Sequence, residues 1–245
     1  MRFEGKSIVV FGGSAGIGFA AAKAFQAEGG NVAITGRDAD ALSAIQAKTG
    51  IRAVQADIGN VAQCRDALGV LASSMGGIDV LFVNAGVGGF AAIEHVSVEF
   101  WDNIHSVNLR GAFFAIQSAL PLLHDGGNIV ITGSIGSVAA VPGNVAYAAA
   151  KAGLRAVARI VGRELLPRGI RVNMVSPGPT DTEIFKRGVS QKEIDEMRTT
   201  LSEVVPIGRM GTSEEIADAV LFLASKEASF INGVDLYVDG GCVEL

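Results

Sequence analysis

The chain has 245 residues, of which 49% are hydrophobic, and it holds 32 Gly against only 6 Pro. This length suits one large α/β domain with a substantial core. The composition suits parallel strands that are covered on both faces. The net charge of −5 and the pI near 5.3 argue against a nucleic-acid partner and against a surface for anionic membranes.

Cysteines and histidines are few and scattered. Cys64 and Cys242 are too few for a disulfide framework, and neither lies in a metal-like cluster. The histidines show no ligand spacing and are interpreted as ordinary surface or core residues: His95, His105 and His124. We therefore expect no metal site.

Two segments bear on a membrane location. Charged residues precede the first apolar run of the N-terminus, which is not the pattern of a signal peptide. Residues 126–150 carry no charge and are long enough to raise the question of a membrane span. Glycines, two asparagines and Pro142 interrupt that stretch, so a buried strand, a loop and a helix start fit it better. We expect a soluble, cytoplasmic protein with no membrane partner.

Short β-branched runs alternate with helical patterns along the chain. The expected strands are Ser7–Phe11, Asn31–Thr35, Arg52–Ala56, Val80–Asn84, Asn128–Thr132, Arg171–Ser176 and Val234–Val238. The expected helices are Gly16–Ala27, Asp40–Lys48, Val61–Ser73, Trp101–Leu123, Val145–Leu166 and Glu214–Ala224. This alternation predicts a single Rossmann-type, doubly wound α/β domain over residues 1–245, with a seven-stranded parallel sheet flanked by helices.

A glycine-rich turn joins the first strand to the first helix. In the run 12–18 (GGSAGIG), Gly12 suits a tight turn, Gly16 lets the backbone approach a pyrophosphate, and Gly18 allows close helix–strand packing. The free N–H groups of the helix N-terminus would face the phosphates. At the first β–α junction, this pattern indicates a dinucleotide site.

The end of the second strand bears on the choice of cofactor. An NAD-type site wants an acidic side chain there for the ribose 2′-hydroxyl, but Gly36 occupies that position and Arg37 follows. A guanidinium pairs with a 2′-phosphate through charge-assisted hydrogen bonds. We expect NADP(H) to be preferred, with NAD(H) possible. The alternative is a surface arginine paired with Asp38 or Asp40.

Tyr147 and Lys151 are four residues apart, and Ser134 lies thirteen residues before Tyr147. Residues i and i+4 lie on one face of a helix, so an ammonium is expected beside a phenol. At about 4 Å and an effective dielectric of about 20, their attraction is roughly 4 kcal/mol. That attraction could move the tyrosine pKa from about 10 towards about 7. The alternative is an ordinary surface helix.

Residues 180–206 interrupt the alternation of strands and helices. Their helical segment, 191–198, is polar. A long insertion before the last core helix is a candidate substrate lid. The alternative is a solvated excursion of the chain.

In combination, these motifs resemble those of the short-chain dehydrogenase/reductase family in its compact single-domain form. The resemblance covers nearly all of residues 5–241. Its motifs are the glycine loop 12–18, Asp57, Asn84-Ala85-Gly86, Asn108, Ser134, Tyr147 with Lys151, the segment 177–182 (PGPTDT), and the ending 237–241 (YVDGG).

The resemblance implies four catalytic residues. Tyr147 would be the acid in ketone reduction and the base in alcohol oxidation, and Ser134 would donate a hydrogen bond to the substrate oxygen. Lys151 would lower the Tyr147 pKa and bind the nicotinamide ribose. Asn108 would hold a water that links Lys151 to solvent. Asn108 as a helix-kink residue and Ser134 as a turn residue are the plain alternatives.

The resemblance also implies a set of cofactor contacts. Asp57 and the Ile58 backbone would contact adenine, the Asn84 segment would lie beside the adenine ribose, and residues 177–182 would hold the nicotinamide amide. The full expected cofactor set is Gly12, Ser14, Gly16, Ile17, Gly18, Arg37, Asp57, Ile58, Asn84, Ala85, Gly86, Tyr147, Lys151, Pro177, Gly178, Thr180 and Thr182.

Two residues depart from the family pattern. Phe11 stands where the family usually has Thr, so packing is expected to replace a hydroxyl contact between strands. Ala15 stands where NADP-preferring members often carry a basic residue. This leaves Arg37, helped by Ser14, to bind the 2′-phosphate.

The substrate is expected to be a hydrophobic carbonyl compound or secondary alcohol. The loops that should line the pocket, 87–90 (VGGF) and 138–144 (VAAVPGN), are small and apolar, and Ile184 and Phe185 extend this character into the lid. None of these loops carries an arginine clamp, which counts against dicarboxylate or phosphorylated substrates, although Arg187 in the lid weakens that argument. The alternatives are a β-ketoacyl reductase acting on carrier-bound chains and a non-catalytic dinucleotide-binding sensor.

The family resemblance also implies a homotetramer. It would form through the two long helices expected at Trp101–Leu123 and Val145–Leu166. Arg155, Arg159 and Arg163 form a stripe that could make ion pairs across this contact, or a plain solvated face.

Overall fold

The computed structural model describes residues 1–182 and 190–245. Seven parallel strands form one sheet in the order β3-β2-β1-β4-β5-β6-β9. The strands are β1 Ser7–Phe11, β2 Asn31–Gly36, β3 Arg52–Gln55, β4 Ile78–Val83, β5 Leu123–Thr132, β6 Arg171–Pro177 and β9 Asp235–Val238. The predicted doubly wound, seven-stranded parallel sheet is confirmed. Its order reverses between β1 and β4, where such folds bind their ligands.

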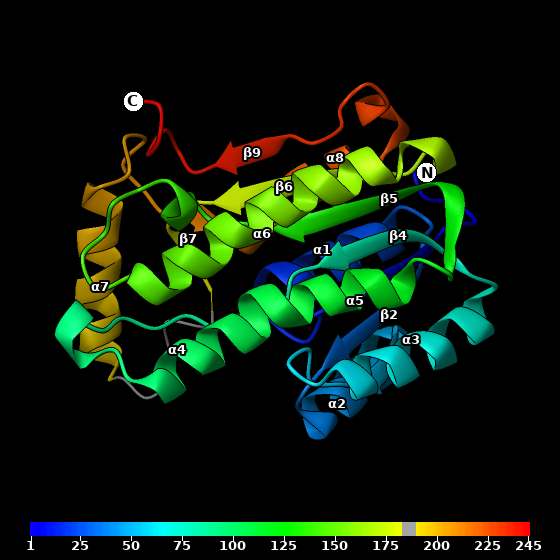
Figure 1. The fold of residues 1–245 in the computed structure, drawn as a ribbon, viewed down its shortest axis with the longest axis horizontal. Helices are drawn as coiled ribbons and strands as arrows, with labels where there is room; N and C mark the ends of the chain where they lie inside the picture. Colours follow the sequence, from blue (N-terminus) through cyan, green and yellow to red (C-terminus); the bar gives the residue numbers. More distant parts are fainter. Residues whose placement is uncertain (183–189) are drawn as a thin grey trace.

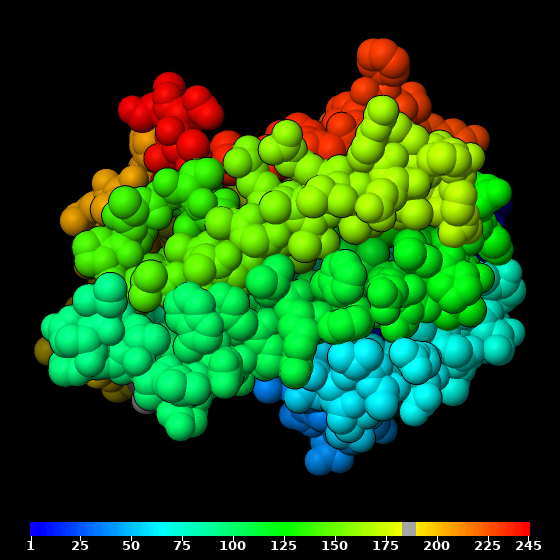
Figure 2. All heavy atoms as spheres, in the orientation of Figure 1, coloured from blue at the N-terminus to red at the C-terminus, as the bar shows by residue number. Residues whose placement is uncertain are grey.

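Helices cover both faces of this sheet (Figure 1). They are α1 Gly16–Ala27, α2 Ala39–Thr49, α3 Val61–Met75, α4 Val98–His105, α5 Ala112–Ala119, α6 Val145–Glu164, α7 Gln191–Glu203 and α8 Ser213–Ala224. Figure 2 shows α3, α5 and α6 side by side over one face, while α1 and α8 pack on the other. Of the helices in residues 1–182 and 190–245, none is long and apolar enough to cross a membrane.

Each strand divides its side chains between two cores. Along β1, Val9 and Phe11 join the cluster under α3, α5 and α6, while Ile8 and Val10 join the cluster under α1 and α8. This alternation follows from the two-residue period of a strand. Phe11 is fully buried, so packing does occupy the position where a threonine was expected.

The long helix predicted over Trp101–Leu123 is wrong as a single element. α4 ends at His105, a π-helix (η2, Ser106–Gly111) follows, and α5 ends at Ala119. A Cβ on Gly111 would lie 2.4 Å from the Ile58 carbonyl oxygen, so the helix can pass this loop only because a glycine is present. Leu123 belongs instead to β5, where it pairs with Ile78 ahead of an irregular register.

Two short strands and several short helical turns were not predicted. β7 (Thr180–Asp181) pairs with β8 (Gly211–Thr212) in a second, two-stranded sheet. Two residues are too few to show a sequence period. The remaining turns of 3₁₀-helix are η1 Ile93–His95, η3 Ile135–Ser137, η4 Leu166–Arg168 and η6 Lys226–Ala228.

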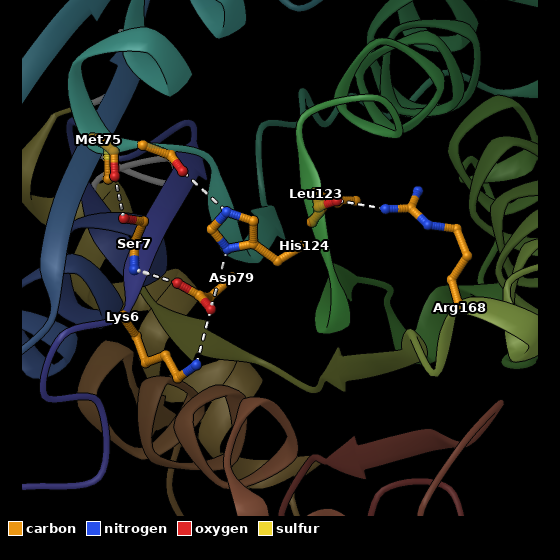
Figure 3. Close-up of polar contacts among 8 residues, drawn as sticks. Lys6, Ser7, Met75, Asp79, Leu123, His124 and Arg168 are labelled. Atoms are coloured by element: carbon orange, nitrogen blue, oxygen red, sulfur yellow. Dashed lines mark hydrogen bonds and ion pairs between the residues drawn. The ribbon is translucent and has the colours of Figure 1, made fainter.

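A polar cluster closes the amino-terminal edge of the sheet, away from the glycine loop (Figure 3). The Asp79 carboxylate accepts hydrogen bonds from the Ser7 backbone N–H and from Lys6 Nζ, both at 2.9 Å. His124 Nδ1 lies 3.5 Å from the same carboxylate. Burial raises the Asp79 pKa, but the hydrogen bonds from Ser7, Lys6 and His124 outweigh it, so the pKa lies below its usual value.

This cluster predicts a pH-dependent stability. Because the folded-state pKa of Asp79 is depressed, its contribution is present above the unfolded pKa of about 4. It is lost as pH falls through the folded value. Asp79→Asn should lower the unfolding free energy at neutral pH by about 1–3 kcal/mol. The difference from wild type should shrink below about pH 4 in urea titrations.

Asp125→Asn is the matched control. Asp125 is exposed and pairs with Arg168 Nε at 2.7 Å on the surface, where such pairs contribute about 0–1 kcal/mol. A difference between Asp79→Asn and wild type that persisted undiminished at pH 3 would contradict this assignment.

Candidate active site

The residues expected in the site gather where the strands end. Ser134 follows the end of β5, and the glycine loop follows β1. Tyr147 and Lys151 lie on the first turns of α6, and residues 177–182 lead from β6 into β7. The carboxyl ends of parallel strands meet at one edge of a sheet, which brings these segments together.

Ser134 and Tyr147 lie close together, because a Cβ built on Gly136 would lie 3.2 Å from Ser134 Oγ and 3.6 Å from Tyr147 Cε1. Ser134 caps the short helix η3, and its Oγ accepts from the Gly136 N–H at 3.0 Å. Burial raises the pKa of the partly buried Tyr147, and the hydrogen bond with Ser134 only partly opposes that rise. The Tyr147 phenol is therefore held in its protonated form at neutral pH.

Lys151 is held beside this pair by the end of β5. Its side chain is buried, and its ammonium donates to the Thr132 carbonyl oxygen at 2.7 Å. Its Nζ lies 5.7 Å from the centre of the Tyr147 ring. Burial lowers the Lys151 pKa to about 8.

The expected lowering of the Tyr147 pKa by Lys151 is wrong for the chain by itself. The i, i+4 spacing does place the ammonium near the ring, but the ammonium is directed to a backbone carbonyl rather than to the phenol oxygen. Desolvation then dominates at both residues, and it disfavours the charged form of each.

Asn108 lies in the π-helix and is fully buried. Its amide nitrogen donates to the carbonyl oxygens of Ile104 and Val87 at 2.9 and 2.8 Å, and its Oδ1 accepts from the Val87 N–H at 3.3 Å. A Cβ on Gly86 would lie 2.8 Å from Asn108 Oδ1 and 3.8 Å from Lys151 Nζ. Asn108 thus fastens the loop after β4 to the helix kink, close to Lys151.

The glycine loop has the geometry of a phosphate cradle. Gly12 has φ +75°, and a Cβ there would lie 2.7 Å from Ala85 Cα. A Cβ on Gly18 would lie 2.1 Å from the Gly12 carbonyl oxygen. No side chain caps α1, and its first turn holds no acidic residue. The backbone N–H groups of Gly16 and Ile17, at the N-terminus of α1, are therefore free to bind a pyrophosphate.

Ser14 lies beside Gly36 at the carboxyl end of β2, and Arg37 follows Gly36 in the chain. Arg37 is exposed directly after Gly36, and a Cβ on Gly36 would lie 2.9 Å from Ser14 Oγ. Asp38 caps α2 through the Ala41 N–H. The structure therefore gives Asp38 a local role other than pairing with Arg37, and places the Ser14 hydroxyl next to the expected 2′-phosphate position.

The segment after β6 folds over the glycine loop. A Cβ on Gly178 would lie 2.7 Å from Asp239 Cα, so Pro177 and Gly178 pass close to the C-terminal segment. Thr180 is buried and donates to the Gly178 carbonyl oxygen at 2.9 Å. Thr182 lies within 3.6 Å of a Cβ built on Gly16.

The remaining expected residues lie along the ends of β3 and β4. Asp57 Oδ1 accepts from the Gly59 N–H at 2.9 Å, which shapes the turn after β3, and Ile58 is buried. Asn84 Nδ2 donates to the Gly12 carbonyl oxygen at 3.1 Å. Asn84 thereby joins the glycine loop to the end of β4.

Thr132 is a site residue that the sequence reasoning missed. Its hydroxyl donates to Asn84 Oδ1 at 2.9 Å, and its carbonyl oxygen accepts from Lys151. Through Asn84 it connects β5, β4 and the glycine loop, a link between strands that Phe11 cannot make. A hydroxyl on the residue that ends a central strand, two positions before Ser134, was the available signal.

Three residues of the expected substrate lid fall within the segment 183–189. Ile184, Phe185 and Arg187 lie outside the described residues. Within residues 1–182 and 190–245, no three His, Cys, Asp or Glu side chains are grouped so as to hold a metal ion. The site as a whole combines the phenol of Tyr147, the hydroxyl of Ser134 and the buried ammonium of Lys151 with the glycine loop expected to bind a dinucleotide.

Comparisons with known proteins show which chains this one is similar to. The family model described as enoyl-(acyl carrier protein) reductase matches residues 12–243. The oxidoreductase asL5 of Sarocladium schorii is 36% identical and covers 100% of this chain and 98% of its own. The D-threitol dehydrogenase of Mycolicibacterium smegmatis is 34% identical, over 98% and 94%. A short-chain dehydrogenase of Burkholderia cenocepacia, solved with NADP, is 35% identical over 99% of both chains, with a TM-score of 0.87.

Proposed function

The chain belongs to the short-chain dehydrogenase/reductase family, and from this premise we propose that it reduces a hydrophobic ketone to a secondary alcohol with NADPH. The observation that carries the proposal is the meeting of Ser134, Tyr147 and Lys151 beside the glycine loop. That the chain is an oxidoreductase of this family is given by its relatives; the direction, the cofactor preference and the substrate are our proposal.

We assign to Tyr147 the role of the proton donor to the substrate oxygen. A tyrosine phenol is protonated at neutral pH, and burial raises the Tyr147 pKa further, so the residue holds a proton that it can give to the developing alkoxide of a ketone. Ser134 donates a second hydrogen bond to the same oxygen. Lys151 binds the nicotinamide ribose and exchanges protons with solvent, and Asn108 positions it through the loop at Val87.

The residues of the cradle fit a nicotinamide dinucleotide, which supplies the hydride when bound. Gly12 and Gly18 let Ala85 and the Gly12 carbonyl pack closely against the loop, which keeps the turn tight, and the α1 N-terminus receives the pyrophosphate. Arg37 and Ser14 receive the 2′-phosphate, which favours NADPH. The NADP complex of the Burkholderia cenocepacia relative supports this choice.

The proposed hydrophobic substrate rests on two loops at the site. The loop after β4 and the loop before α6 are joined by a hydrogen bond from the Ala91 N–H to the Gly143 carbonyl oxygen at 2.9 Å. Both present apolar side chains to solvent, among them Phe90 at 69% and Val141 at 46% exposure. By its name, the Mycolicibacterium smegmatis relative acts on a polyol, which is the competing substrate class.

A carrier-bound acyl chain is the second candidate, because the matching family model is described by a carrier-linked activity. Docking an acidic carrier calls for basic residues near the pocket. Residues 126–150 carry no charge, and the two arginines that could contribute beyond them form hydrogen bonds within the chain. Arg168 bonds Asp125 and the Leu120 carbonyl oxygen, and Arg171 bonds the carbonyl oxygens of Leu223 and Ser225. These contacts favour free ketones.

We therefore expect ketones or keto esters to be reduced without a carrier. The test follows nicotinamide absorbance for a panel of ketones and alcohols with both cofactors, and then compares kcat/KM for one β-ketoacyl group as a free ester and on its carrier. A carrier advantage above about tenfold that disappears at high salt would favour the second candidate. No turnover with any compound would favour a non-catalytic dinucleotide sensor.

We also propose a cytoplasmic homotetramer. Ile160 on α6 is 59% exposed and Phe230 is fully exposed, so α6 and the segment before β9 offer apolar surface to other copies. Arg155, expected at such a contact, instead pairs with Asp235 of its own chain at 3.1 Å. Light scattering of the purified protein measures the number of copies in the oligomer.

The proposed cytoplasmic location is supported by the two free cysteines, which fit a reducing compartment.

A further inference from the structure

Asn144 is a polar residue beside the reactive pair that the proposed mechanism leaves without a role. It is only 8% exposed and directly precedes α6. A Cβ built on Gly136 would lie 3.0 Å from Asn144 Nδ2, 3.2 Å from Ser134 Oγ and 3.6 Å from Tyr147 Cε1. The amide, the serine hydroxyl and the edge of the phenol ring thus border the same small space.

The Asn144 side chain does not serve the helix that it precedes. Asparagine at a helix start usually has extended backbone angles and accepts from the first turn. Asn144 has φ −101° and ψ 13°, and its side chain makes no cap hydrogen bond. Its backbone alone is bonded, to the Val141 carbonyl oxygen and from the Ala148 N–H. Within residues 1–182 and 190–245, its amide group has no hydrogen-bond partner.

The amide atoms of Asn144 are not among the fully buried polar atoms that lack a partner, so they reach the solvent beside Ser134 and Tyr147, where a bound ligand can replace water. The amide carries two donors and one acceptor and no charge. It can donate to a neutral hydroxyl or carbonyl oxygen and accept from a hydroxyl, but it supplies no charge to pair with a carboxylate or phosphate. The apolar loops around it allow one such group rather than several.

We infer that Asn144 is a specificity-determining residue that binds a second, neutral oxygen on the carbon next to the reacting carbonyl. The preferred substrates are then α-hydroxy or α-keto ketones with an otherwise hydrophobic body. Such substrates carry more oxygen groups than a plain ketone and fewer than a polyol. The inference rests on the proposed function, because Ser134 and Tyr147 must hold the reacting oxygen for Asn144 to reach its neighbour.

The test compares acetophenone with its α-hydroxy derivative. The ratio of their kcat/KM values in wild type is set against the ratio in Asn144→Leu, so the intrinsic reactivity of the two ketones cancels. The ratio should fall by about three- to tenfold in Asn144→Leu, the effect of one neutral hydrogen bond. Asn144→Gln, which keeps the amide, should retain more of the preference.

Melting temperature and NADPH affinity are the readouts that separate specificity from structure. A helix-capping role predicts that Asn144→Leu and a second variant, Asn144→Ala, lose stability while the substrate ratio stays constant. A ratio unchanged within about twofold in both variants, with both ketones still reduced, overturns the inference and leaves the proposed function standing. No reduction of either ketone by wild type would count against the proposed function, and the inference would fall with it.

Discussion

Tyr147→Phe is expected to lower kcat by about 10²–10⁴-fold while leaving NADPH affinity nearly unchanged. The substitution removes only the phenolic oxygen, and a positioned proton donor contributes about that factor. The ring remains to pack beside Lys151. Because Lys151 is held by the Thr132 carbonyl rather than by the phenol oxygen, its position should survive the change.

The measurement is single-turnover and steady-state reduction of the best ketone, with NADPH affinity from fluorescence. Tyr237→Phe is the matched control, since the chain has only two tyrosines and Tyr237 lies on β9. It should keep wild-type turnover. A Tyr147→Phe variant that retained more than about a tenth of kcat, a barrier change below about 1.4 kcal/mol, would remove Tyr147 from the proton-donor role.

The pKa directions also bear on the direction of the reaction. Burial favours the neutral form of both groups, so Tyr147 holds its proton and the pKa of Lys151 is lowered to about 8. A protonated phenol is ready to act as an acid on a ketone, whereas oxidation of an alcohol needs the phenolate. Near neutral pH, the Tyr147 phenol of the chain itself is therefore in the protonated form that reduction requires. Any pKa seen in a rate profile will belong to the Tyr147–Lys151 pair.

Much of the fold could be predicted because most core strands are short apolar runs that alternate with helical patterns. The predicted range for β1 matches the structure, and β2, β3, β6 and β9 differ by one residue. The π-helix could not be predicted from periodicity, and within it Gly111 approaches Ile58 so closely that a Cβ would not fit. Residues distant in the chain decide that contact, and a local pattern does not record them.

In the candidate site, too, local spacing could be predicted from the sequence, whereas contacts between distant residues could not. Spacing alone placed Lys151 one turn from Tyr147, and the structure brings the two together. Spacing did not reveal where the ammonium points, because the acceptor is the backbone of Thr132 and every residue has a carbonyl. Asn144 lies in the loop 138–144 that was expected to line the pocket, but the sequence indicated no role of its own for it, since an asparagine before a helix is expected to cap it and the structure shows that this one does not.

The selection of NADPH over NADH should depend mainly on Arg37. A hydrogen bond to a charged group contributes about 1.5–3 kcal/mol, so Arg37→Ala should weaken NADPH binding by about 10- to 150-fold. NADH lacks the 2′-phosphate, and its Kd should change little. Arg52→Ala is a suitable control, because Arg52 is an exposed arginine at the opposite end of the neighbouring strand, bonded to Asn31 Oδ1 at 2.8 Å.

Adding a carboxylate at Gly36 should shift the preference further towards NADH. An aspartate there can accept from the ribose 2′-hydroxyl and repels a phosphate. Its Cβ would lie 2.9 Å from Ser14 Oγ and 3.4 Å from Leu42 Cδ2. The serine hydroxyl must therefore rotate away, so the effect is best measured with Gly36→Asp alone and combined with Ser14→Ala.

The dissociation constants of both cofactors for wild type, Arg37→Ala and the Gly36→Asp variants decide the matter. We expect the NADPH preference to fall in the single variant and to reverse when Arg37→Ala and Gly36→Asp are combined. If wild type already binds NADH more tightly, or if Arg37→Ala weakens both cofactors equally, Arg37 is not the selecting residue. With Ala15 where a basic residue would add to the selection, no neighbouring cation in the glycine loop could then take its place.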